Sequence, residues 1–428
     1  MWIEPGLERT CVDQNILEKK REFAKCLLEK VDFSRNLSDR EIFEMIDDFL
    51  LQEERCRDLS LENKKLLRRE LFHALRKLDI LQDLVDNPEV TEIMINGPNH
   101  LFVEKAGKLS QYPLSFESKE KLEDVIQQIV SGCNRVVNEA NPIVDARLEN
   151  GSRVNIVLAP VALEGPVVTI RRFPEHPITM EKLIAFGSLT EDLAEWLKLL
   201  VEAGYNLFIS GGTGSGKTTF LNALSAFIPR DERVITIEDN AELQIMNLPN
   251  LVRLETRNAN VEGCREITMR DLIKTSLRMR PDRIIVGEVR GGEAFDMMQA
   301  MNTGHDGSMS TGHANSSRDM LSRIENMILM GMDLPLKAIK QQIASGIDFI
   351  VHLGRLRDRS RKVLEIVEIV GFEQEEIVCR PLFHFSETGV DDMGRILGKW
   401  KKVGEMTHFE KLEAAGLDQQ IRRIGERL

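Results

Sequence analysis

The sequence predicts an α/β protein built on a wound, mostly parallel sheet, and three features support this class. Short apolar stretches alternate with helical segments between about residues 178 and 370, as expected for such a sheet. One apolar stretch, NLFIS, leads directly into the glycine-rich segment GGTGSGKTT. Two others, RVITIED and RIIVGEV, end in carboxylates. Ligands collect at the carboxyl ends of strands in such sheets, so we expect these segments to share one edge.

Composition narrows the class of protein. The chain has 428 residues, enough for two or three domains, and a formal net charge of −12. This acidic balance argues against a general nucleic-acid binder, because neutralising phosphates requires a basic excess. The six cysteines form no CxxC pair, so neither a zinc module nor a redox motif is expected. No stretch has the apolar length of a membrane span, and the N-terminus lacks a signal core, so we expect a cytoplasmic protein.

The spacing of apolar residues and the predicted secondary structure change along the chain, and these changes predict the domain boundaries. The first part spaces its apolar residues as amphipathic helices do, whereas the next part contains a hairpin, a helix and further strands. Pro174 and Pro177 mark a linker, and β-rich stretches follow Gly346. The predicted parts are an N-terminal helical region, 1–85; a small α+β domain, 86–173; a linker, 174–180; and the main α/β domain with a β-rich C-terminal extension, 181–428.

The segment NLFISGGTGSGKTTFLNALSAFI matches the phosphate-loop pattern in both residues and spacing. Its glycines let consecutive backbone N–H groups curl around phosphate oxygens, and the following helix adds positive potential. Lys217 is expected to reach the outer phosphates, and Thr218 to offer its hydroxyl to Mg²⁺. The sequence therefore predicts a site for ATP and Mg²⁺ whose loop residues are Gly211, Gly212, Thr213, Gly214, Ser215, Gly216, Lys217, Thr218 and Thr219.

The carboxylates near this loop are arranged unusually. Many nucleotide enzymes end a buried strand with an aspartate that helps to hold Mg²⁺, but here Gly287 and Glu288 stand at that end. We expect Glu288 to orient or deprotonate the attacking water. Mg²⁺ is then expected to be bound, partly through water, by residues of the loop and of the neighbouring acidic strand: Thr218, Glu238, Asp239 and Glu242.

Two histidines occur in Thr-Gly-His units within MNTGHDGSMSTGHANS, at His305 and His313. Both are expected on loops around one strand of the nucleotide domain. An imidazole there can donate to a phosphate oxygen and respond to its loss, although a lone histidine is more often a satisfied structural residue. We predict a nucleotide-sensing role for both, and a stronger one for His313.

The ordered motifs GGTGSGKTT, ITIEDNAEL, LRMRPDRIIVGEVRGGEA and TGHDGSMSTGHANS resemble those of the secretion-ATPase superfamily, the motors of type II and type IV secretion and of type IV pili. The segment VTEIMINGPNHLFVEKAGKL is similar to the CpaF-like branch, which powers Tad pilus assembly. The resemblance implies a RecA-like P-loop ATPase domain preceded by a PAS-like α+β domain, assembled as a homo-hexamer. It also implies a Walker A loop, an Asp box from Glu238 to Glu242, Glu288 as the catalytic glutamate and a His box.

The resemblance further implies arginines that reach the nucleotide of a neighbouring subunit or of a closing domain. The matching positions are Arg147, Arg153 and Arg171 or Arg172. A two-residue turn at Asn150-Gly151 would put Arg147 and Arg153 on opposite faces of their hairpin, because side chains alternate along a strand. A loop with one extra residue would put them on the same face.

These observations lead to one expected function and two alternatives. The expected function is a ring-shaped ATPase that acts on an integral membrane platform protein at the cytoplasmic face of the bacterial inner membrane, without direct contact to nucleic acid. The first alternative is a DNA-transfer ATPase or nucleic-acid motor. The second is an ATP-gated scaffold that does not hydrolyse, and Glu288 weighs against it.

Overall fold

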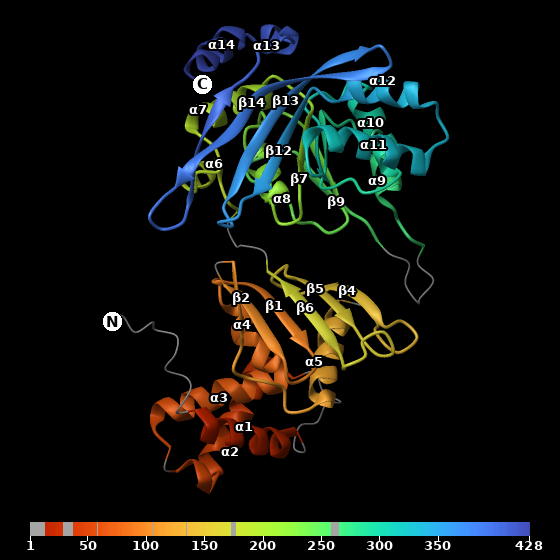
Figure 1. Ribbon diagram of the computed structural model, residues 1–428. Coiled ribbons are helices and arrows are strands. Elements are labelled where there is room, and N and C mark those ends of the chain that lie inside the picture. The colour runs from red at the N-terminus through yellow and green to blue at the C-terminus, as the bar shows by residue number, and fades with distance from the viewer. Residues whose placement is uncertain are drawn as a thin grey trace. The chain divides into compact units, whose positions relative to one another are not determined.

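The computed structural model describes residues 13–28, 37–57, 59–105, 107–133, 135–172, 177–257 and 265–428. The chain divides into two compact units, Met1–Glu175 and His176–Leu428, each with its own hydrophobic core (Figure 1). Of the prolines in the predicted linker, Pro177 is described, whereas Pro174 lies outside the described residues. Among the described helices, none combines the length and apolar character needed to cross a bilayer.

The first unit begins with a small helical bundle. Ser38 and Glu41 form a reciprocal capping box that starts its second helix. Apolar residues at helical spacing, among them Phe23, Ile46 and Leu71, make its core. The described helices of this bundle are α1 (Asp13–Leu28), α2 (Asp39–Gln52) and α3 (Leu61–Arg76), and a short α4 (Gln82–Asp86) follows.

A six-stranded antiparallel sheet forms the rest of the first unit, in the order β3-β2-β1-β6-β5-β4. One face is buried against helix α5 (Lys119–Gly132), and side chains alternate strictly, so that Val154 and Ile156 are buried while Arg153 and Asn155 point to the other face. The strands are β1 (Val90–Asn96), β2 (Leu101–Lys105), β3 (Lys108–Gln111), β4 (Ile143–Arg147), β5 (Arg153–Val157) and β6 (Val167–Arg171).

The second unit is built on a nine-stranded sheet in the order β15-β14-β13-β12-β7-β11-β10-β8-β9. Strands from β12 to β9 in this order run parallel, and β13, β14 and β15 extend the sheet with antiparallel pairings. The strands are β7 (Leu207–Gly211), β8 (Val234–Glu238), β9 (Leu251–Glu255), β10 (Arg283–Val286), β11 (Met309–His313), β12 (Phe349–Arg355), β13 (Arg361–Glu373), β14 (Glu376–Val390) and β15 (Ile396–Lys402).

Helices cover both faces of this sheet and confirm the predicted α/β class (Figure 1). One core joins the sheet to α6 (Met180–Ala185), α7 (Glu191–Glu202), α8 (Lys217–Ser225), α13 (Glu410–Ala415) and α14 (Asp418–Arg427). The other core joins it to α9 (Met269–Ser276), α10 (Glu293–Met301), α11 (Ser317–Gly331) and α12 (Leu336–Gly346). The carboxyl ends of the parallel strands therefore meet at one edge.

A buried cation fixes the amino end of β10. Arg283 is only 2% exposed, and its Nη1 donates to the Val201 carbonyl at 2.6 Å. Its Nη2 donates to Glu232 Oε1 at 2.7 Å, and its Nε donates to the other oxygen of the same carboxylate. The bidentate pair satisfies a charge that would be costly to bury alone.

We expect Arg283→Met to destabilise the second unit by about 3 kcal/mol, because the change removes the bidentate cationic partner of Glu232 and one of the donors to the buried Val201 carbonyl. Chemical denaturation followed by tryptophan fluorescence would measure the loss through Trp196 and Trp400, which lie in this unit. The exposed Arg318 provides the control, since Arg318→Met is expected to change stability by less than about 0.5 kcal/mol. Equal stability of the two variants would contradict the role given to Arg283.

Candidate functional site

The glycine-rich loop between β7 and α8 has the geometry of an anion site. Gly214 and Gly216 have φ values of 71° and 92°, a conformation that glycine adopts without strain. Gly216 is the N-cap of α8, and no described side chain caps this helix end. The first amides of α8 are thus left for a ligand, as the phosphate-loop pattern predicts, and Thr218 and Thr219 lie in this first turn, partly exposed.

Lys217 places a buried ammonium in this loop. The residue is 7% exposed, and its Nζ donates to the Gly212 carbonyl at 3.1 Å and lies 3.2 Å from His313 Nδ1. Among the described residues, no carboxylate lies within 4.0 Å of Nζ. Burial lowers the pKa of Lys217, while the charge of Glu288 acts in the opposite direction. A buried cation that contacts only neutral groups suits an anionic ligand.

His313 connects Lys217 to Glu288. Its Nε2 lies 2.9 Å from Glu288 Oε1, and its Nδ1 faces Lys217. Burial and the neighbouring Lys217 lower the pKa of His313, so the imidazole is neutral near pH 7. A neutral ring with its proton on Nε2 fits both neighbours, because Nδ1 can then accept from the ammonium while Nε2 faces a carboxylate oxygen.

Glu288 follows β10 and is held from its other side by an arginine. Arg290 Nη2 donates to Glu288 Oε2 at 2.8 Å, and Arg290 Nη1 lies 4.0 Å from Asp239 Oδ2. The same guanidinium thus bridges the acids that follow two neighbouring strands. Sequence reasoning did not single out Arg290, although it stands two residues after Glu288 in GEVRGG.

Glu238 differs from the other acids because it supports the chain. The residue is 3% exposed, and its Oε1 accepts hydrogen bonds from the backbone N–H groups of Glu242 at 2.9 Å and Leu243 at 2.8 Å. A Cβ at Gly287 would lie 2.8 Å from Glu238 Cγ, so there is no room for a side chain at that position. Burial raises the pKa of Glu238 to about 7, against the lowering effect of the two backbone hydrogen bonds.

The predicted metal residues do not form a closed cage. Glu238 Oε1 is used by the backbone, its Oε2 is buried without a hydrogen-bond partner, and the side chain of Asp239 is 46% exposed. Glu242 is partly buried in the loop after β8. Mg²⁺ needs little from the protein, since it usually keeps several waters and binds through one or two carboxylates and the phosphates. The Thr218 hydroxyl and the nearby acids are compatible with such a site.

His305 does not join this group. It precedes β11, whereas His313 is the last residue of that strand, so the two histidines lie at opposite ends of the same strand. His305 Nδ1 lies 3.1 Å from the Ala300 carbonyl, and its own carbonyl accepts from Ser308 Oγ at 2.7 Å. The contacts of His305 in this subunit support a structural role, whereas those of His313 with Lys217 and Glu288 support the predicted nucleotide-sensing role.

The arginines of the first unit separate into two groups. Leu148 N donates to the Ser152 carbonyl at 2.9 Å, which closes a three-residue loop and makes Arg147 and Arg153 register partners. Arg153 is in turn the partner of Arg171. The three arginines therefore form one row on the face opposite the core, which decides between the two turn geometries in favour of the longer loop.

Arg172 lies outside this row. It follows Arg171, so its side chain points to the other face, where Nη1 donates to the Asn87 carbonyl and, at 3.2 Å, to the Val90 carbonyl. These bonds fix the start of β1. Of the two alternatives Arg171 and Arg172, these contacts favour Arg171 for the predicted catalytic role and a structural role for Arg172, because the Arg172 guanidinium is directed at backbone oxygens of its own unit.

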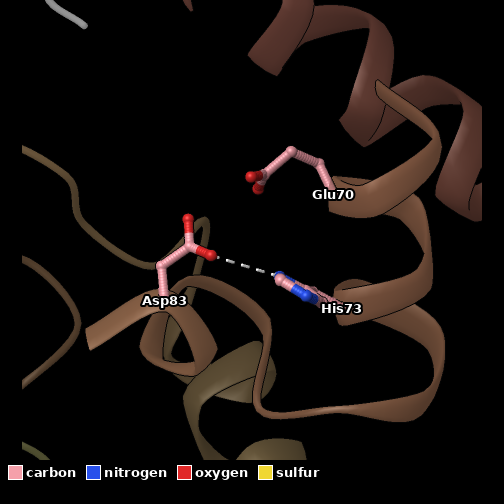
Figure 2. A group of neighbouring side chains, drawn as sticks. All are labelled: Glu70, His73 and Asp83. Atoms are coloured by element: carbon pink, nitrogen blue, oxygen red, sulfur yellow. Dashed lines mark ion pairs between the residues drawn. The ribbon is translucent and has the colours of Figure 1, made fainter. Parts of the chain in front are cut away.

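A second group of polar side chains lies in the helical part of the first unit. Glu70 and His73 on α3 face Asp83 on α4 (Figure 2), and the ligand atoms of these three lie within 4.8 Å of one another. Two cations already neutralise the carboxylates: Lys20 Nζ is 3.3 Å from Glu70, and Arg69 is 3.6 Å from Asp83. The group therefore acts as an ion-pair network that joins the helices.

The buried Glu238 gives protein stability a specific pH dependence. Because its pKa is raised from 4.5 to about 7 on folding, the folded state binds more protons between these values, and stability falls as pH rises through about 7. Between about pH 6 and pH 8, the native protein should lose roughly 1 kcal/mol more than Glu238→Gln. Denaturation at both pH values would measure this difference. The exposed Glu266→Gln should behave like the native protein, and identical pH slopes for all three proteins would be inconsistent with a protonated Glu238.

Residues 74–404 match the family described as "Type II/IV secretion system protein". A Mycobacterium tuberculosis protein named for conjugal transfer is 34% identical over 312 residues, covering 72% of this chain and 87% of that protein. The type IV secretion system protein VirB11 of Brucella suis is 31% identical, covering 64% and 84%. The pilus retraction motor PilT with bound ADP shares the fold, with a TM-score of 0.52, 17% identity, and coverage of 81% and 88%. The chain therefore belongs to the type II/IV secretion system protein family, the secretion-ATPase superfamily that its motifs predict.

Proposed function

We propose that this protein binds ATP with Mg²⁺ and hydrolyses it to ADP and phosphate, as the homo-hexameric motor of a pilus-assembly or secretion system. The observation that carries the proposal is the continuous series of contacts from Lys217 through His313 to Glu288, next to the uncapped start of α8. A buried cation, a neutral imidazole and a carboxylate meet where a helix end offers free amides. The cation and the free amides can stabilise charge on a phosphate, and the carboxylate can orient water or accept its proton, so the group suits phosphoryl transfer to water.

The proposed chemistry follows from these groups. The loop amides and Lys217 hold the phosphates, and Glu288 accepts the proton of the water that attacks the terminal phosphorus. The bond between that phosphorus and the bridging oxygen breaks, and the charge left on the diphosphate is stabilised by Lys217 and the loop. Thr218 and the acids near Asp239 would hold Mg²⁺, which would supply positive charge next to the outer phosphates. His313 responds to this step because it contacts both Lys217 and Glu288.

The machine that the motor serves is a further part of the proposal. The motifs of the first unit resemble the CpaF-like branch, so we favour assembly of a Tad or type IV-like pilus, or protein secretion, through a membrane platform protein at the cytoplasmic face. Relatives named for conjugal transfer and type IV secretion support transfer of DNA as the second candidate. Stimulation of hydrolysis by single-stranded DNA would favour the second candidate. Co-purification of a pilus platform protein from native membranes would favour the first.

Glu288→Gln is expected to keep nucleotide binding and to lower turnover by a factor of at least about 10², since the amide cannot accept a proton. Lys217→Ala should instead weaken nucleotide binding itself, because the buried positive charge is lost. Titration with ATP and a phosphate-release assay separate the two effects. Glu266→Gln, on an exposed segment, serves as the matched control for Glu288→Gln. Near-normal hydrolysis by Glu288→Gln would refute the role of this carboxylate.

The row formed by Arg147, Arg153 and Arg171 allows a test of whether one subunit contributes to the site of its neighbour. Replacing Arg147, Arg153 and Arg171 together by Gln should lower turnover by about 10³-fold, the low end of the effect of an arginine on a transferring phosphate, without a large loss of stability. Arg172→Gln should instead lower stability by about 1–3 kcal/mol, since it removes a charged donor from the Asn87 and Val90 carbonyls. If the row serves a neighbouring subunit, mixing the triple variant with Lys217→Ala subunits should restore hydrolysis. Full activity of the triple variant alone would rule out this role.

A further inference from the structure

Two arginines of the second unit lie against the phosphate loop on the side away from Glu288. Arg355 ends β12 and Arg361 begins β13, and they are register partners, so their side chains share one face of the sheet. Leu353, two residues before Arg355, belongs to the core that includes Phe220 and Leu221 of α8. The shared face is therefore the one on which α8 and its loop lie.

The contacts of both arginines are with the loop itself. Arg361 Nε donates to the Gly214 carbonyl at 2.8 Å, and its Cδ lies 3.3 Å from the position that a Cβ of Gly216 would take. Arg355 Nη1 lies 3.8 Å from the corresponding position at Gly214. The two guanidinium groups thus reach the two left-handed glycines that shape the loop.

The arginines of the hairpin formed by β12 and β13 differ in whether a carboxylate neutralises them. The segment GRLRDRSRK is strongly basic, and Arg357 within it is paired with both oxygens of Glu387. Arg355 is exposed, and among the described residues no carboxylate lies within 4.0 Å of its guanidinium. An uncompensated guanidinium next to a loop of free amides suits the oxygens of a phosphate, which it can bind in a bidentate manner.

The strand order indicates which part of the ligand Arg355 reaches. Strand β7 lies between β11 and β12, with His313 at the end of β11 and Arg355 at the end of β12. Glu288 follows β10, which lies beyond β11. Glu288 is thus on one flank of the loop and Arg355 is on the other, so a phosphate chain whose terminal phosphate faced Glu288 would turn its diphosphate part toward Arg355.

We propose that Arg355 binds the diphosphate part of the nucleotide, and that Arg361 is a positioning residue that holds the Gly214 carbonyl outward so that the loop amides face the phosphates. This proposal rests on the nucleotide site proposed above. Because the diphosphate part is common to ATP and ADP, Arg355 contributes equally to the affinity for both. Glu288 and its partners, in contrast, act at the terminal phosphate.

The test compares Arg355→Gln with Arg357→Gln, which removes the same charge from the same hairpin but from a guanidinium engaged by Glu387. Titration calorimetry on the full chain gives the Kd for ADP, and the Glu288→Gln background gives the Kd for ATP without hydrolysis. Arg355→Gln should raise both values about tenfold, as loss of one hydrogen bond to a charged group implies, with their ratio unchanged. Arg357→Gln should stay within about twofold of the parent protein.

Arg361 is tested through its conservative variant. Arg361→Met should raise KM several-fold while kcat at saturating ATP stays within about twofold, and Arg361→Lys should restore most of the loss, since an ammonium can still donate to the Gly214 carbonyl. A general folding defect would lower kcat and the melting temperature and would not be rescued in this way.

Several results would overturn the inference. If Lys217→Ala loses binding but Arg355→Gln matches Arg357→Gln, the inference fails and the nucleotide site stands. A loss confined to ATP would place Arg355 at the terminal phosphate and would also refute the proposal. If the native protein binds neither ADP nor ATP, the proposed function fails together with the inference.

Discussion

The buried ammonium of Lys217 is the interaction on which the rest of the site depends. Burial of a cation is costly, and the protein surrounds this one with a backbone carbonyl and a neutral imidazole while leaving the adjacent amides of α8 unsatisfied. The parallel strands then bring the other groups to the same edge: His313 from β11, Glu288 after β10 and Asp239 after β8. The buried cation and the free amides lack a negatively charged partner until an anion binds. The fold therefore determines that this site takes an anion.

Much of the fold could be predicted from local patterns. NLFIS, RVITIED and RIIVGEV became β7, β8 and β10. The strand β9 was missed, because LVRLE is a half-exposed edge strand and lacks the continuous apolar run of a central one. The C-terminal extension was predicted only as β-rich, but it ends in the helices α13 and α14, which are separated where Gly416 adopts a left-handed conformation. Such breaks depend on a single residue and are easily overlooked.

The site shows where reasoning from sequence reaches its limit. The phosphate loop and the strand-end acids follow from motif spacing and from parallel topology, both of which are local or nearly so. Arg290, Arg355 and Arg361 were missed because surface arginines are common and only strand register shows which of them face the loop. The contacts of His305 and Arg172 favour structural roles for a related reason. His305 lies at the opposite end of β11 from His313, and Arg172 points to the opposite face of the sheet from Arg171, and neither difference shows in a motif.

The crowding between Glu238 and Gly287 explains why β10 is followed by a glycine and then a glutamate, where many nucleotide enzymes have an aspartate at the end of the strand. The side chain of Glu238 fills the space that a residue at position 287 would need, so the strand can end only in glycine there. The carboxylate next along the chain, Glu288, lies beyond the end of β10, where it meets His313 and Arg290. The two acids therefore differ in their surroundings: Glu238 holds the backbone after β8, whereas Glu288 contacts His313 and Arg290. A substitution at position 287 would push Glu238 aside and so loosen the segment that Glu238 holds, although residue 287 itself makes no contact with that segment.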